Sequence, residues 1–148
     1  MDILVVEDDD FKFEEIESLI KSFSDKFHIK RYGNVFDTVR YLNNSTPDKI
    51  ILDMSLPSHP AKPGEGTPVS MPSGGIEVIL ELRYLKKISL PIIVLTQFSH
   101  VEVEHEYCTM PEAERKIKEL YRMDNIIIQA YEKGSQAWKD ATIDFLRD

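Results

Sequence analysis

Short apolar runs alternate along the chain with longer segments in which apolar residues recur every three or four positions. Runs of four to six apolar residues are typical of strands covered on both faces, and the longer spacing predicts helices. The expected strands are 2–6, 27–32, 49–52, 92–95 and 125–130. The expected helices are 11–23, 35–42, 76–87, 111–123 and 135–146.

This strand–helix alternation, repeated five times, predicts an α/β protein with a parallel sheet. Parallel strands need crossover connections, which are right-handed and place helices on both faces of the sheet. In open sheets of this kind, ligands bind beyond the carboxyl ends of the strands, where the strand order reverses. Functional residues are therefore expected directly after the strands.

Two connections are longer than such a fold requires. Residues 54–75 contain five prolines and four glycines, which predicts a loop insertion. Residues 99–110 alternate apolar and acidic side chains and are expected to form a short strand or an extended arm before the fourth helix. Both extensions follow the carboxyl ends of strands, so both are expected to overhang the site.

Composition narrows the class of protein. The chain has 148 residues, 42% of them hydrophobic and 30% charged, with a net charge of −8, which fits one soluble domain over 1–148. No basic cluster is present, which argues against nucleic acid as a partner. The lone Cys108 fits a reducing compartment. Because neither a signal peptide nor a membrane span is evident, we expect a cytoplasmic protein without membrane contact.

Four of the expected strands end in residues suited to phosphate chemistry. Glu7 and Asp8 follow the first strand, Asp53 the third, Thr96 the fourth and Lys133 the fifth. Because the carboxyl ends of parallel strands share one sheet edge, these acids, the hydroxyl and the ammonium should meet there. Such a set predicts a site for a divalent cation and a phosphoryl group.

The segments that carry these residues resemble the receiver domain of bacterial two-component response regulators. The similar stretches are ILVVEDD (3–9), IILDMSLP (50–57), GGIEVI (74–79), LPIIVLT (90–96) and YEKG (131–134). Each motif alone is weak, but all five occur in the family's order. The resemblance implies a flavodoxin-like (βα)5 doubly wound fold with strand order 2-1-3-4-5 and with extensions after the third and fourth strands.

The same resemblance implies a magnesium site beside a phosphorylated aspartate. Asp53 matches the phosphoacceptor, and Asp8 and Asp53 match direct Mg²⁺ ligands. Glu7 would act through water, and the backbone carbonyl of Ser55 would complete the protein ligands. Physically, neighbouring carboxylates retain protons unless a cation offsets their charge, and Mg²⁺ accepts a few oxygen ligands plus water.

Two further roles follow from the resemblance. Thr96 matches the hydroxyl that hydrogen-bonds the phosphorylated side chain and so couples the chemistry to the following loop. Lys133 matches the lysine after the fifth strand, whose charge would neutralise phosphoryl oxygens in the transition state.

Three positions depart from the family pattern. Gln97 stands where a small residue is usual and should narrow access to Asp53. Gly134 stands where proline is usual, which leaves Lys133 less firmly placed. Ala130 stands where an aromatic switch residue is frequent. Tyr131 is one position further, and strand alternation should send it to the opposite face.

The leading hypothesis is a stand-alone receiver without an output domain, phosphorylated on Asp53 by a histidine kinase or phosphotransfer protein. Its output would be contact with a partner protein through the fourth helix, fifth strand and fifth helix; a homodimer is left open. It would be no enzyme beyond self-phosphotransfer and autodephosphorylation. One alternative is a receiver-like interaction module independent of phosphate. A less favoured one is an aspartyl phosphatase, which needs a general acid at position 55, occupied here by Ser55.

Overall fold

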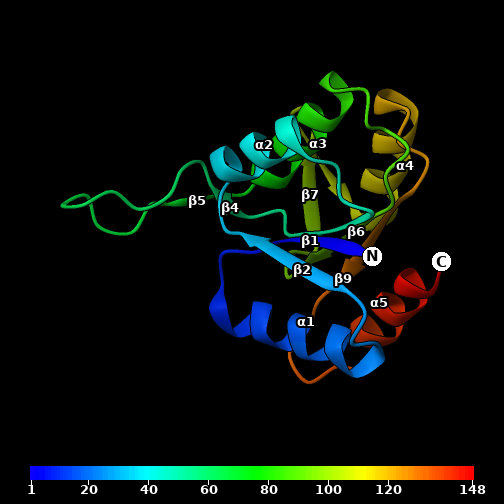
Figure 1. Cartoon of the computed structure of the whole chain (residues 1–148). Helices are drawn as coiled ribbons and strands as arrows, with labels where there is room; N and C mark the ends of the chain where they lie inside the picture. Colours follow the sequence, from blue (N-terminus) through cyan, green and yellow to red (C-terminus); the bar gives the residue numbers. More distant parts are fainter.

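The computed structural model describes residues 1–148 and has five parallel strands at its centre (Figure 1). The spatial order is β2-β1-β3-β6-β9, which is 2-1-3-4-5 when only the strands of this sheet are numbered. This order confirms the doubly wound (βα)5 fold. The strands are β1 (Asp2–Val6), β2 (His28–Tyr32), β3 (Lys49–Leu52), β6 (Ile92–Thr96) and β9 (Ile126–Ala130).

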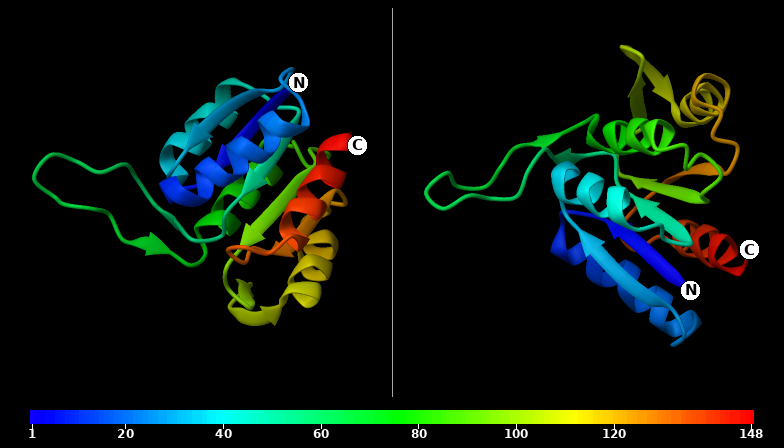
Figure 2. Two further views of the ribbon diagram at one scale, coloured as in Figure 1. Left: turned by 90° about the horizontal axis from the view of Figure 1, so that it is seen from below. Right: turned by 45° about the horizontal axis from the view of Figure 1, so that its top comes forward.

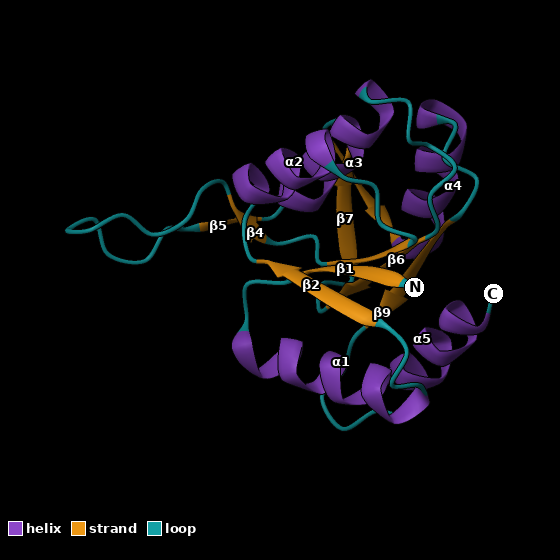
Figure 3. Ribbon diagram, viewed as in Figure 1, coloured by secondary structure: helices purple, strands orange, loops and turns teal.

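Helices cover both faces of the sheet, as the crossover rule requires (Figure 3). They are α1 (Asp10–Phe23), α2 (Val35–Asn44), α3 (Gly74–Tyr84), α4 (Met110–Tyr121) and α5 (Ala137–Arg147). Alternate residues of β1 show the two layers: Ile3 and Val5 pack with α1 and α5, and Leu4 and Val6 pack with α2, α3 and α4. The three central strands β1, β3 and β6 are nearly all apolar because both of their faces are buried, whereas the edge strand β2 has no buried residue.

The starts of the helices are fixed by N-cap side chains and, for α3, by a glycine. Asp9 caps α1 by accepting a hydrogen bond from the Lys12 backbone N–H at 3.3 Å, as its place after the first strand predicts. Asn34 and Thr109 cap α2 and α4 in the same way. At the start of α3, a Cβ on Gly75 would lie 2.6 Å from the Asp53 carbonyl oxygen, so only glycine lets the helix approach the end of β3 this closely.

The first extension is an arm that projects from the body of the protein (Figure 2). It is mostly loop, as expected, but its base is closed by a two-stranded antiparallel ribbon of β4 (Leu56–Pro57) and β5 (Ser70–Met71). Residues 60–67, at the far end of the arm, are all exposed. The ribbon holds the returning strand close to the end of β3.

The second extension is a hairpin of β7 (His100–Val103) and β8 (Glu106–Thr109), which settles the choice between strand and arm. Glu104 and His105 both adopt positive φ at its two-residue turn, as such hairpins require. The hairpin packs against α4, and its turn reaches Tyr121, whose hydroxyl donates to Glu104 at 2.6 Å. None of the helices is long and apolar enough to cross a bilayer.

Candidate functional site

Three carboxylates meet at the carboxyl edge of the sheet. Val6 and Leu52 are register partners in β1 and β3, so Glu7 and Asp8 emerge beside Asp53. One oxygen from each of the three acids lies within 4.8 Å of the others. They open into a cleft of about 200 Å³. Its lining residues are Glu7, Asp8, Asp9, Asp53, Ser55, Ser70, Gln97 and Phe98.

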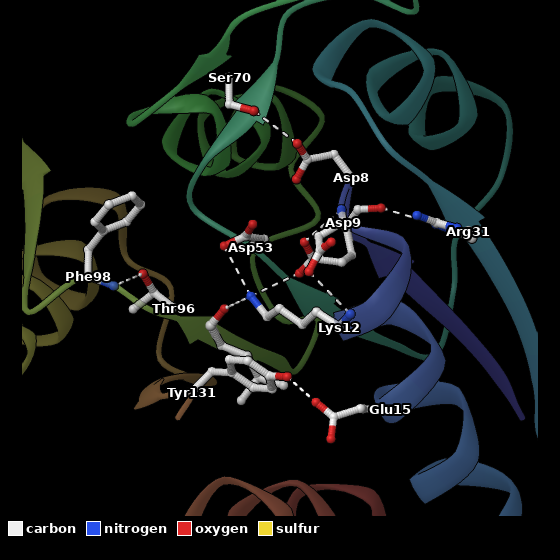
Figure 4. Close-up of polar contacts among 12 residues, drawn as sticks. Asp8, Asp9, Lys12, Glu15, Arg31, Asp53, Ser70, Thr96, Phe98 and Tyr131 are labelled. Carbon is white, nitrogen blue, oxygen red and sulfur yellow. Dashed lines mark hydrogen bonds and ion pairs between the residues drawn. The ribbon is translucent and has the colours of Figure 1, made fainter. Parts of the chain in front are cut away.

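A buried lysine from α1 lies among these acids (Figure 4). The Lys12 ammonium is 2.9 Å from Glu7 Oε1 and 3.3 Å from Asp53 Oδ1. It also donates to the Leu95 carbonyl oxygen at 2.6 Å. Lys12 is only 1% exposed. Because an ammonium has three N–H donors, these three acceptors can satisfy it fully.

Burial dominates the electrostatics of the acid pair. Glu7 is 2% exposed, and desolvation together with the charge of Asp53 raises its pKa to about 8, against the opposing effect of Lys12. Burial also raises the pKa of Asp53, and the charge of Lys12 and a hydrogen bond with Glu7 counteract part of this rise. At neutral pH the cluster therefore tends to retain a proton that a bound cation would displace.

The donor set fits a hard divalent cation. Carboxylate and carbonyl oxygens are the protein ligands that Mg²⁺ prefers, and it keeps several waters. Asp8 and Ser55 are partly exposed in the cleft, while Asp53 is 8% exposed, so the oxygens are near solvent but not freely hydrated. Lys12 supplies one positive charge against three acids, which leaves an excess of negative charge for a cation to offset.

Thr96 ends β6, the neighbour of β3, and is completely buried. Its hydroxyl accepts a hydrogen bond from the Phe98 backbone N–H at 3.1 Å, so it holds the start of the following loop. Gln97 and Phe98 from that loop line the cleft. Gln97 thus lies in the same cleft as Asp53, the position from which it was expected to narrow access to that side chain.

The arm also contributes to the site. The Ser70 hydroxyl, from β5, donates to Asp8 Oδ2 at 2.9 Å. Of residues 54–75, only Ser55 and Ser70, at the base of the arm, line the cleft. The rest of the arm projects away from the body, so the arm borders the site but does not overhang it as expected (Figure 2). The hairpin does not meet the matching expectation, because none of residues 99–110 lines the cleft. It packs on α4 instead, where its alternating apolar side chains find a core.

Lys133 does not join the acids. It is exposed, and its ammonium lies 4.5 Å from the centre of the Phe11 ring, on the outside of α1. The ion pairs of Asp53 are with Lys12 alone. Gly134 adopts a left-handed φ of 81° directly after Lys133, so the backbone turns away where the family has a proline. The structure therefore does not bring Lys133 to the acids as expected, and the ammonium beside Asp53 is that of Lys12.

Tyr131 lies on the α1/α5 side of the sheet, as strand alternation predicted. Its backbone N–H donates to the Thr96 carbonyl oxygen at 2.8 Å, and its ring lies 5.0 Å from the Lys12 ammonium. Its hydroxyl donates to Glu15. The Tyr131 ring thus lies beside the buried lysine, and Ala130 occupies the position opposite Thr96 in the sheet.

Lys12 was not predicted as a site residue, because it lies on a helix and not directly after a strand. A signal was present: Lys12 is the third residue of α1, after the Asp9 cap and Asp10. Side chains on a helix tilt toward its N-terminus. A long side chain in the first turn after a catalytic strand can therefore reach back across the sheet edge. Lys12 shares the buried face of α1 with Ile16 and Ile20, at a spacing of four residues. A lysine on an otherwise apolar face in the first turn was the signal that could have identified it.

A doubly wound sheet whose carboxyl edge brings together Glu7, Asp8 and Asp53, with Thr96 at the end of the neighbouring strand, is the arrangement expected of a receiver domain. No family model matches the chain. The Detocs response regulatory protein DtcB of Vibrio alginolyticus is 45% identical over 147 residues, which cover 98% of this chain and 99% of that protein. An uncharacterised protein, y4jR of Sinorhizobium fredii, is 24% identical over 147 residues, 95% of this chain and 93% of its own length.

Solved structures show the same fold. The receiver domain of the Francisella response regulator 1452 aligns with a TM-score of 0.61 at 17% identity, covering 99% of this chain and 93% of that one. The receiver domain of the sensor histidine kinase PA1611 of Pseudomonas aeruginosa, described with magnesium in its active-site cleft, aligns with a TM-score of 0.60 at 18% identity, covering 97% and 93%. The chain belongs to the response regulator receiver family.

Proposed function

We propose that this protein is a phosphorelay receiver that accepts a phosphoryl group on Asp53. The observation that supports this most directly is the buried contact between Asp53 and Lys12 at 3.3 Å, inside an acidic cleft that is open to solvent. A carboxylate whose negative charge is offset by a neighbouring cation can act as a nucleophile toward phosphorus. The donor would be a histidine kinase or phosphotransfer protein in the cytoplasm.

We propose Mg²⁺ as the cofactor. Asp8 and Asp53 would bind it directly, Glu7 through water, and Ser55 through its backbone carbonyl. When bound, Mg²⁺ supplies positive charge to the phosphoryl oxygens. The protein's own residues orient the acceptor: β1 and β3 fix the acids, and Ser70 fixes Asp8. Thr96 would donate a hydrogen bond to the phosphorylated side chain.

We propose that output is contact with a partner protein through α4, β9 and α5. Leu120 of α4 and Ile127 of the edge strand β9 are large apolar side chains that are about half exposed. A shallow pocket lined by Lys118, Ile127 and Phe145 joins the three elements. Exposed apolar groups rimmed by charges are typical of protein-binding surfaces. A second copy of this chain is one candidate partner for the same surface.

Acetyl phosphate labelling tests the acceptor assignment. The wild-type chain, incubated with acetyl phosphate and Mg²⁺, should gain the mass of one phosphoryl group, and Asp53→Asn should gain none while remaining folded by circular dichroism. Removal of Mg²⁺ with a chelator should stop labelling. Label on Asp53→Asn, or none on the wild type under conditions that label a control receiver, would instead favour an interaction module that does not depend on phosphate.

A further inference from the structure

We propose that Lys12 supplies the ammonium that contacts the phosphoryl group on Asp53, the role that the family resemblance gives to Lys133. This inference deepens the proposed function and depends on it. It concerns which element of the fold carries the charge: the first turn of α1, not the segment after β9. Lys12 would pair with the Asp53 carboxylate before transfer and with phosphoryl oxygens after it.

The contacts of Lys12 place it where this role requires. Its ammonium lies 3.3 Å from Asp53 Oδ1, so a group added to that carboxylate comes within reach of a small movement of the lysine side chain. Water is excluded, since Lys12 is 1% exposed, and this strengthens its electrostatic effect. Lys133, which is exposed and lies over Phe11, has neither property.

The surroundings keep Lys12 in this position. Its ammonium lies 5.0 Å from the centre of the Tyr131 ring, a distance at which a cation and a ring attract. Tyr131 is itself fixed, because its hydroxyl binds Glu15 and its ring packs on Trp138 with centroids 4.9 Å apart. An arrangement of two aromatic rings beneath one buried lysine preorganises the charge before any phosphoryl donor arrives.

The transfer step itself involves no oxidation or reduction. With acetyl phosphate as donor, an Asp53 carboxylate oxygen attacks phosphorus and forms a new O–P bond. The bond from phosphorus to the acetyl oxygen breaks, and its electron pair leaves with acetate. Lys12 would act by charge and hydrogen bonding, since it faces negative oxygens in reactant and product alike.

Lys12 also ties the acceptor to strand β6. Its hydrogen bond to the Leu95 carbonyl, at 2.6 Å, ends one residue before Thr96. A phosphoryl group on Asp53 offers further anionic oxygens that compete with this carbonyl for the ammonium. Phosphorylation of Asp53 would therefore weaken the hydrogen bond from Lys12 to the end of β6, the strand that carries Thr96 and the loop after it.

Labelling of two matched variants tests the assignment. Lys12→Gln should label with acetyl phosphate and Mg²⁺ about 100-fold more slowly than the wild type, the usual loss for one preorganised charge or donor. Lys133→Gln, an equal change in charge at an exposed position, should label within about twofold of the wild type. The opposite pattern, slow labelling in Lys133→Gln and normal labelling in Lys12→Gln, would overturn the inference.

Binding measurements separate an electrostatic role from a structural one. Loss of the Lys12 charge should strengthen Mg²⁺ binding about tenfold, because the cation no longer meets an ammonium among its ligands. At saturating Mg²⁺, the same variant should bind beryllofluoride, a phosphoryl mimic, about tenfold more weakly. Both can be followed by calorimetry. If Lys12→Gln weakens both ligands together, Lys12 merely supports the fold and the inference fails.

A second variant covers the case in which Lys12→Gln does not fold with two unpaired acids. Glu7→Gln combined with Lys12→Gln removes the buried ion pair as a unit and is compared with Glu7→Gln alone. The double variant should label about 100-fold more slowly than the single one, and equal rates would refute the role. Wild-type protein that takes no label overturns the proposed function, and this inference with it. A labelled wild type with unchanged Lys12→Gln overturns this inference alone.

Discussion

The arm and the hairpin leave neighbouring strands at the same edge of the sheet, yet they differ in what they do. The arm, residues 54–75, has an exposed end and touches the acidic cleft through Ser70. The hairpin, residues 99–110, buries Val101, Val103 and Cys108 against α4 and does not line the cleft. Alternating apolar residues made one extension a part of the core. Prolines and glycines kept the other outside it, where only its base contacts the site.

The largest expected difference between the two extensions is in stability. It is measured by replacing one valine by alanine in each extension. Val103→Ala, at a position that is 0% exposed, should lower the free energy of unfolding by roughly 2 kcal/mol through lost burial and a small cavity. Val69→Ala, at a position in the arm that is 86% exposed, should change it by less than about 0.5 kcal/mol. Urea denaturation measures both. Equal effects would mean that the hairpin is not part of the core.

The pH dependence of Mg²⁺ binding tests the acidic cluster, which the arm contacts through Ser70 and which the hairpin does not contact. The pKa of Glu7 is raised from 4.5 to about 8, so metal-free protein at pH 7 holds a proton that the cation must displace. Mg²⁺ affinity should therefore rise with pH, approaching about tenfold per unit below pH 8, and level off above it. Calorimetry in two buffers of different ionisation enthalpy should show proton release at pH 7.

The same pH profile distinguishes the two extensions. Val103→Ala should leave the midpoint of the profile and the Mg²⁺ affinity at each pH unchanged, because the hairpin does not reach the cluster.

The stability of metal-free protein should also depend on pH. The unfolded state binds fewer protons than the folded state between pH 4.5 and about 8, so stability should fall as pH rises through that window. A profile that is flat from pH 5 to 8 would show that Glu7 is not held protonated by its surroundings.

These differences also show what the sequence could reveal. The strand pattern predicted the sheet and brought Glu7, Asp8 and Asp53 together, since parallel strands leave little choice about where their ends lie. The position of Lys12 beside Asp53 was not predicted, because it depends on the reach of a helix side chain, which strand periodicity does not encode. The contact between Ser70 and Asp8 was not predicted either. It depends on how the returning segment of the loop pairs with β4, and this pairing involves only two residues of each strand.

Ser70→Ala should weaken Mg²⁺ binding up to about tenfold, because its hydroxyl orients a carboxylate that we propose as a direct ligand. Ser58→Ala, in the outgoing half of the same arm, has no contact with the cluster and serves as the control. Isothermal titration at pH 8 suits both variants. If Ser70→Ala binds Mg²⁺ as the wild type does, the hydrogen bond between the arm and Asp8 does not contribute to metal binding.

The smallest effect is expected from shortening the arm itself. Replacing residues 60–67 by Asn-Gly removes only exposed residues and keeps the β4–β5 ribbon, so Ser70 stays beside Asp8. Halving the loop should stabilise the fold by about 0.6 kcal/mol through a lower cost of closure, and Mg²⁺ affinity should stay within about twofold. A large loss of Mg²⁺ binding would show that the tip of the arm, and not only its base, contributes to the site, because the ribbon alone would then not hold Ser70 in place. Thermal unfolding and calorimetry on the same sample decide between the two.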